Sequence, residues 1–216
     1  RSPTAPEGRG VPAGVRVYAI GDVHGCRMQL ERLLDHIECE VQATDLECHL
    51  VMLGDLVDRG PDTAGVLSRM VDRPLPCSHL TLLMGNHEEV MLRVLKGDTS
   101  LLGQWLTFGG AECVRSYGVD PRALGKMAPD EAIALLRQKI PRRHVDFVAN
   151  FADSVSFGSY LFVHAGIRPG IGLGEQAQND LRWIREPFLT DERDHGHVVV
   201  HGHTICETVE ELPNRI

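Results

Sequence analysis

The sequence lacks the features that mark several common protein classes. It has no run of about 18 consecutive apolar residues, the length that a membrane-spanning helix needs. Its six cysteines include no C-x-x-C pair and no short framework. This argues against a zinc knuckle or a disulfide scaffold and favours reduced thiols in a cytoplasmic protein. The sequence also has no internal repeat and no low-complexity tract.

The sequence also has fewer basic than acidic residues. The chain has 22 Lys and Arg against 30 Asp and Glu, which gives a formal net charge of -8. An acidic surface does not attract nucleic acid or an anionic membrane, so we expect neither as a partner. Phosphate remains a candidate ligand, because bound metal cations would reverse the sign of the charge inside a site.

Length and composition indicate one globular domain. The chain has 216 residues, of which 43% are hydrophobic and 24% are charged. This length corresponds to one domain of ordinary size. The first residues are rich in proline and glycine, so we expect a flexible N-terminal arm over residues 1–14 and a single domain over residues 15–216.

Short apolar runs alternate with helical patterns along much of the chain. Five runs are predicted as strands, at residues 15–20, 49–53, 79–84, 160–163 and 197–200. Apolar residues at helical spacing separate the first three runs, which predicts an α/β core with crossover helices. Residues 89–159 contain several further helical patterns, and we predict a mainly helical insertion there.

A glycine and a side chain able to bind metal stand at the end of each predicted strand. These side chains are Asp22, His24, Asp55, Asn86, His164 and His203. Ligands collect at the carboxyl ends of strands in α/β sheets. The set is too large for one tetrahedral site, and two cations about 3.5–4 Å apart that share Asp55 fit it better. Each residue alone would be a turn aspartate or a surface histidine, but their coincidence at five strand ends favours a metal centre.

Five short segments resemble a known family. Gly-Asp-Val-His-Gly at 21–25, Gly-Asp-Leu-Val-Asp-Arg-Gly at 54–60 and Gly-Asn-His-Glu at 85–88 resemble, in order, three signature blocks of the phosphoprotein phosphatase branch of the calcineurin-like metallophosphoesterases, the bacterial serine/threonine phosphatases among them. Phe-Val-His-Ala-Gly at 162–166 and Val-His-Gly-His-Thr at 200–204 resemble the family's two later histidine blocks. The resemblance implies a β-sandwich flanked by helices in α/β/β/α layers, with further strands beyond residue 216.

The resemblance also implies a metal-ligand set. Two divalent cations would be bound, Mn²⁺ first, with Fe or Zn as alternatives. Asp22 and His24 would hold one cation, Asp55 would bridge, and Asn86, His164 and His203 would hold the other. His201 competes for the last role, and His203 is preferred because the family's ligand follows the glycine.

Catalytic roles follow from the same resemblance. The two cations would activate water for in-line attack on phosphorus. His87 is expected to protonate the leaving group, and Asp58 is expected to orient this imidazole and keep it protonated. Trp105 is expected only to pack in the core.

The phosphate group needs fixed donors of its own. Arg59 is expected to bind the phosphate group with two N–H groups, and Asn86 is expected to contribute to the same phosphate site. Arg185 is the expected second arginine, with Arg182 and Arg168 as alternatives.

Three hypotheses about function remain. The first is a phosphomonoesterase acting on phosphorylated proteins or peptides, serine/threonine first and tyrosine second. The second is a dinucleoside polyphosphate hydrolase of the diadenosine tetraphosphate type. That branch typically lacks the aspartate of Asp-Arg-Gly and has aspartate in place of Glu88, so Asp58 and Glu88 favour the first hypothesis. The third is an inactive phospho-ligand-binding module, against which the intact ligand set argues. Nothing in the sequence indicates an oligomeric state.

Overall fold

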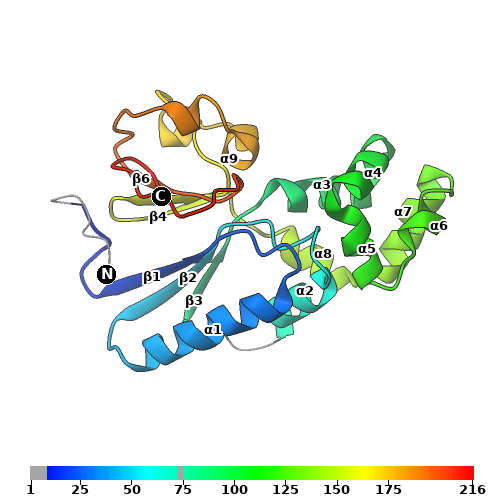
Figure 1. Ribbon diagram of the computed structural model, residues 1–216, viewed down its shortest axis with the longest axis horizontal. Coiled ribbons are helices and arrows are strands. Elements are labelled where there is room, and N and C mark those ends of the chain that lie inside the picture. The colour runs from blue at the N-terminus through cyan, green and yellow to red at the C-terminus, as the bar shows by residue number, and fades with distance from the viewer. Residues whose placement is uncertain (1–8, 73–74) are drawn as a thin grey trace.

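The computed structural model of the chain describes residues 9–72 and 75–216 and contains two three-stranded sheets (Figure 1). The first sheet consists of β1 (Val15–Ile20), β2 (Glu47–Met52) and β3 (His79–Leu82), all parallel and in that order. The central strand β2 is buried at Leu50, Val51 and Met52. These are the aliphatic residues that made the run recognisable as a strand.

Two crossover helices cover one face of this sheet (Figure 1). They are α1 (Arg27–Gln42), between β1 and β2, and α2 (Thr63–Asp72), between β2 and β3. Helix α1 buries Leu30, Leu34 and Ile37, which are spaced along one helical face. The apolar side of each helix therefore packs on the sheet, as the alternating pattern predicted.

The second sheet stacks on the opposite face of the first (Figure 1). It consists of β4 (Ser154–Phe157), β5 (Tyr160–Val163) and β6 (Val198–Val200). Strand β5 pairs with β4 in antiparallel and with β6 in parallel orientation. The buried residues Val51, Leu53, Leu83 and Phe162 pack together where the two sheets meet.

A second helical layer closes the outer side of this sheet. It contains α9 (Gln178–Trp183) and two short 3₁₀ helices, η2 (Leu173–Glu175) and η3 (Phe188–Thr190). Phe188 is fully buried there, together with Leu181 and Val199. The layers are therefore helix, sheet, sheet and helix.

The insertion lies beside the sheets and is helical over most of its length (Figure 1). Its elements are α3 (Asn86–Lys96), α4 (Thr99–Trp105), the π-helical turn η1 (Leu106–Gly110), α5 (Ala111–Ser116), α6 (Pro121–Leu124), α7 (Pro129–Lys139) and α8 (Arg142–Val148). The predicted range 89–159 was wrong at both ends. Helix α3 already begins at Asn86, and β4 belongs to the second sheet. The polar–apolar alternation of Ser154–Phe157 is the period of a strand.

The expected N-terminal arm is only partly within the described residues. Residues 1–8 lie outside them. Arg9 donates a hydrogen bond to the carbonyl of Pro213, and the Gly10 carbonyl accepts one from the backbone N–H of Ser159. Residues 9–10 thus run beside the second sheet. Within the described ranges, no helix has the length and apolar character needed to cross a bilayer.

Candidate active site

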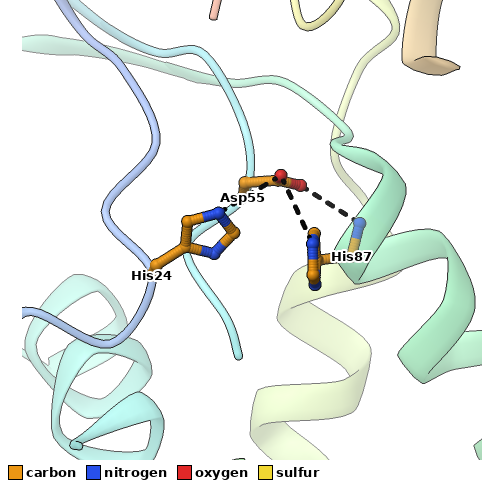
Figure 2. Close-up of side chains that lie close together, drawn as sticks. All are labelled: His24, Asp55 and His87. Carbon is orange, nitrogen blue, oxygen red and sulfur yellow. Dashed lines mark hydrogen bonds and ion pairs between the residues drawn. The ribbon is translucent and has the colours of Figure 1, made fainter. Parts of the chain in front are cut away.

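The predicted donors from the first two strands meet at Asp55. The loop after β1 provides His24, whose Nε2 lies 3.9 Å from Asp22 Oδ2 and 3.6 Å from Asp55 Oδ2. Figure 2 shows His24 and His87 turned toward Asp55 from different segments of the chain. Asp55 is only 1% exposed and is therefore shielded from water.

The donors from the other three strand ends meet around Asn86 Oδ1, and His164 connects them to the opposite oxygen of Asp55. His164 Nε2 lies 3.5 Å from Asp55 Oδ1 and 3.0 Å from Asn86 Oδ1. His203 Nδ1 lies 2.9 Å from the same Asn86 oxygen. The structure thus brings the six predicted ligands together, and Asp55 presents one oxygen to each half of the set.

The imidazole rings of both halves are oriented as metal ligands. His24 Nδ1 donates to the carbonyl of Val57 at 2.8 Å, and His164 Nδ1 donates to the carbonyl of Leu53 at 2.8 Å. Burial lowers the pKa of His24 to about 4 and also lowers the pKa of His164, so both rings are neutral near pH 7. A neutral ring that donates through Nδ1 has a lone pair on Nε2.

These lone pairs have no suitable partner among the described residues. His24 Nε2 is buried without a hydrogen bond. With the Asn86 amide oriented as it is, His164 Nε2 faces only the oxygens of Asn86 and Asp55, which are acceptors as well. Acceptors that converge in this way repel one another unless a cation lies between them. The donor set therefore fits divalent metal ions, since neutral imidazole, carboxylate and amide oxygens are ligands of Mn, Fe and Zn.

His203, and not His201, belongs to this set. Burial lowers the pKa of His203 to about 4, with the charge of Arg185 acting in the same direction, so its ring is neutral too. His201 has its Nδ1 near the carbonyl of Gly202 and its ring packed against Phe188, with ring centroids 5.0 Å apart.

Backbone strain is concentrated at the site. In the described part of the chain, the non-glycine residues with positive φ are His24, Asp55, Asp58, Arg59 and His203, with φ between 44° and 71°. Such conformations cost roughly 1–3 kcal/mol each and persist only where the surroundings enforce them.

Glu88 provides much of that enforcement. Its carboxylate accepts backbone N–H groups of Asp55 (2.8 Å), Leu56 (2.7 Å), Val57 (3.1 Å) and Gly85 (3.1 Å). Burial raises its pKa to about 7, and the charge of Asp55 acts in the same direction. The N–H donors oppose this shift, because a protonated acid would offer them a hydroxyl in place of an acceptor. Glu88 therefore joins the loop after β2 to the start of α3.

Glycines allow these two segments to touch. Gly54 has φ of 98°, and a Cβ atom there would lie 2.7 Å from Gly85 N. A Cβ atom on Gly85 would lie 2.2 Å from Asp55 Oδ1. Close approach thus requires both glycines, and at Gly54 the positive φ favours glycine as well.

His87 and Asp58 form a buried pair beside the donor set. His87 Nδ1 lies 2.7 Å from Asp58 Oδ2, and His87 Nε2 lies 4.0 Å from Asp55 Oδ2. Burial lowers the pKa of His87, but the hydrogen bond to Asp58 and the charges of Asp55 and Asp58 outweigh it and raise the pKa above its usual value. Burial also raises the pKa of Asp58. The pair therefore retains a proton and presents Nε2 of His87 toward Asp55.

The insertion contributes two residues that the sequence did not identify as functional. Trp105 Nε1 donates to Asp58 Oδ2 at 2.9 Å, so this buried tryptophan positions the pair as well as packing in the core. The Gly109 carbonyl accepts the N–H of Arg59 at 3.0 Å, and a Cβ on Gly109 would lie 2.6 Å from Arg59 Cγ. The Gly109-Gly110 pair, four residues after Trp105, was the feature of the sequence that could have indicated a close contact here.

A pocket of about 650 Å³ opens above the site. Arg59, Asn86, His87, Trp105, Arg185 and His203 line it, together with Arg93 and Arg168. Arginine is thus abundant at this one place on an acidic chain.

The three candidates for the second phosphate-binding arginine differ in their partners. Arg182 pairs with Asp153 at 2.6 Å and with Glu89 at 3.3 Å. Arg168 lines the pocket but is engaged by Asp180 at 2.6 Å. Arg185 lines the pocket and forms no ion pair with any carboxylate of residues 9–72 or 75–216.

The chain belongs to the calcineurin-like phosphoesterase family, whose model matches residues 15–210. Its two sheets between helical layers are the fold of that family, so the predicted family and fold class are confirmed.

Two curated relatives and one solved structure are similar to this chain. Serine/threonine-protein phosphatase 1 of Salmonella typhimurium is 34% identical over 125 residues, which are 58% of this chain and 50% of that protein. The symmetrical bis(5'-nucleosyl)-tetraphosphatase of Nitrosospira multiformis is 34% identical over 163 residues, 75% of this chain and 47% of that protein. A metallophosphoesterase structure from Sphaerobacter thermophilus has 17% identity and a TM-score of 0.47, covering 87% of this chain and 59% of that chain. The chain spans about half the length of the curated relatives it matches.

The ionisation of Asp55 predicts a pH-dependent effect of metal on stability. Burial raises the pKa of Asp55 to about 7. At pH 6 most Asp55 side chains are therefore protonated and must lose the proton before they bind a cation, whereas at pH 8 few are. His24 and His203, with pKa values of about 4, are neutral at both pH values. Mn²⁺ should therefore bind about tenfold more tightly and raise the melting temperature more at pH 8 than at pH 6. Differential scanning fluorimetry with Mn²⁺ or EDTA measures this, and equal shifts at both pH values would contradict it.

The contacts of Glu88 predict a large stability loss for Glu88→Gln. The amide places an NH₂ group among backbone N–H donors, and at least one donor is left unsatisfied in the core. We expect the free energy of unfolding, measured in urea, to fall by about 2–4 kcal/mol. Glu89→Gln is the matched control, because Glu89 lies next to Glu88 on the same helix and is partly buried, but its carboxylate accepts from the side chains of Arg182 and Trp183. Similar losses in the two variants would show that Glu88 does not hold the loops.

Proposed function

We propose that this chain is a metal-dependent phosphomonoesterase that acts on phosphorylated proteins or peptides. Asp22, His24, Asp55, Asn86, His164 and His203 would hold two divalent cations, Mn²⁺ first, with Fe or Zn as alternatives. The observation that supports this most strongly is the convergence of unpartnered imidazole lone pairs and carboxylate oxygens around Asp55. The intact set also argues against an inactive binding module.

The protein's own residues would bind and orient the phosphate group. The chemistry that bound divalent cations supply at such a site is activation of a water molecule for in-line attack on phosphorus. Arg59 and Arg185 would stabilise the charge on the phosphoryl oxygens, and neither guanidinium is occupied by a carboxylate within the described residues. Asn86 lines the same pocket and would contribute its amide.

His87 and Asp58 would protonate the leaving group. The hydrogen bond to Asp58 and the nearby carboxylates raise the pKa of His87 and so favour its protonated form, and Asp58 fixes the ring through Nδ1. Nε2 then points toward Asp55 and carries the proton to be donated. The departing alkoxide of a serine or threonine residue needs this proton, because an alkoxide is strongly basic.

This need for an acid favours phosphoprotein over dinucleoside polyphosphate. A nucleotide leaves as a phosphate whose second pKa is about 6, so it departs readily without a proton. A buried Asp58–His87 pair braced by Trp105 would be of little use for that reaction. Phosphoserine and phosphothreonine are thus the first substrates to expect, and phosphotyrosine is the second.

Hydrolysis of a dinucleoside polyphosphate is the second candidate. The similarity to the symmetrical tetraphosphatase covers more of this chain than the similarity to the protein phosphatase does. Phe108 and Trp183 line the pocket and are 62% and 38% exposed, so their rings are available for stacking on a nucleobase. The two candidates share the metal site and differ in the leaving group.

The proposal predicts Mn²⁺-dependent hydrolysis of p-nitrophenyl phosphate that excess EDTA abolishes. The kcat/KM for a phosphoserine peptide should exceed that for diadenosine tetraphosphate. Asp55→Asn should lower kcat by about 100-fold or more, because the substitution removes the charge shared between both halves of the donor set. Asp35→Asn, at an exposed position of α1, is the control and should keep full activity. A higher kcat/KM for the dinucleotide would favour the second candidate, and full activity of Asp55→Asn would refute both.

The role of the Asp58–His87 pair predicts a dependence on the leaving group. Asp58→Asn should reduce kcat on a phosphoserine peptide by about 100-fold, within the range of general acid catalysis. The loss on p-nitrophenyl phosphate should be smaller than about tenfold, because nitrophenolate departs without a proton. Initial rates of the same enzyme preparation on both substrates measure the ratio. Equal losses on both would mean that Asp58 only supports the structure.

A further inference from the structure

A second cluster of metal-ligating side chains lies at the opposite end of the first sheet. Glu47 and His49 are two residues apart in β2, so their side chains are on the same face. His79 begins β3 and is the direct register partner of His49. These residues stand where the strands begin, whereas the candidate active site lies where the strands end.

This face of the sheet is turned toward the second sheet. Val51, two residues beyond His49, is part of the buried layer between the sheets. The ring of His49 contacts Phe157 of β4 edge to face, with centroids 4.8 Å apart. The side chain of His49 is 17% exposed, whereas those of Glu47 and His79 are 54% and 53% exposed. The cluster therefore lies at the open border between the two sheets, where solvent and ions reach it.

The donor atoms converge on one carboxylate oxygen. His49 Nε2 lies 2.9 Å and His79 Nε2 lies 3.3 Å from Glu47 Oε1. The two imidazole rings are stacked, with centroids 4.5 Å apart and planes inclined by 16°. One ligand atom from each residue lies within 4.8 Å of the others. A tetrahedral zinc ion with bonds of about 2.0–2.1 Å separates its ligand atoms by roughly 3.4 Å, which is close to the present spacing of these donors from Glu47 Oε1. To bind one ion, the exposed ring of His79 would turn out of the stack so that both Nε2 lone pairs point at the metal.

An ion-pair role explains the arrangement less well. Two protonated rings stacked face to face on one carboxylate would repel each other, and a single negative charge would have to compensate both. Two neutral rings and one carboxylate are instead a common ligand set of zinc, with a water in the fourth position.

We propose that Glu47, His49 and His79 bind one zinc ion that links β2 to β3 at the border between the sheets. The site is separate from the catalytic donor set and does not depend on the proposed function. Its half-exposed ligands predict reversible binding, and its bridging position predicts that the zinc-bound protein melts at a higher temperature.

The test compares zinc content between matched variants of the full chain. After dialysis against micromolar Zn²⁺ under reducing conditions, His79→Ala should hold one zinc ion fewer per chain than the wild type. His36→Ala should match the wild type, because His36 is an exposed histidine that pairs with Glu40 at 3.5 Å and lies on α1, outside the cluster. Isothermal titration should show the zinc affinity of this site reduced by about 100-fold or lost in His79→Ala. Unchanged zinc content in His79→Ala would overturn the proposal.

A second readout locates the ion by the histidine resonances that respond to it. In long-range ¹H–¹⁵N spectra of the wild type, Zn²⁺ should shift the Nε2 resonances of both His49 and His79 at the same stoichiometry. Glu47→Gln should require more Zn²⁺ for the same shift, because the amide is a weaker ligand. If His24 and His164 respond to Zn²⁺ while His49 and His79 do not, only the catalytic donor set binds metal and the proposal fails. Phosphatase activity enters neither readout, so an inactive enzyme would leave this test intact.

Discussion

The carboxylate of Glu88 is the interaction on which the geometry of the site depends. It accepts backbone N–H groups from the loop after β2 and from Gly85 before α3, and so fixes Asp55 and Asn86 relative to each other. Left-handed backbone at Asp55 would otherwise relax, because a non-glycine residue does not favour it. The hydrogen bonds of Glu88 thus offset strain in the neighbouring loops and hold Asp55 and Asn86 side by side.

Two sheets are needed to complete that donor set. The parallel sheet supplies Asp22, His24, Asp55 and Asn86, and the second sheet supplies His164 and His203 after β5 and β6. The apolar layer between the sheets, with Val51 and Phe162, therefore determines the distance between the donors that each sheet supplies. Asp55 Oδ1 reaches His164 at 3.5 Å across this junction. Packing between the sheets therefore also determines where the candidate metal ligands lie.

The sequence predicted the fold class and the convergence of the donors because both depend on local patterns. Short apolar runs that end at a glycine identify strands, and the carboxyl ends of neighbouring strands meet at one edge. Strand β4 was missed because its two apolar residues, Val155 and Phe157, form too short a pattern beside long helical segments. The contact of Trp105 with Asp58 joins residues 47 positions apart in the chain, and no spacing rule reaches that far.

The insertion contacts two of the residues to which the proposed function gives roles. Trp105 bonds to Asp58 of the proposed general acid pair, and Gly109 fixes the backbone of Arg59, the proposed phosphate ligand. The exposed ring of Phe108 lies between these two contacts in sequence and lines the pocket. A change in the insertion would therefore alter both what fits the pocket and how the Asp58–His87 pair is held. The candidate metal donors, held by Glu88 and the two sheets, would remain in place, so the insertion can reshape the pocket without moving the donor set.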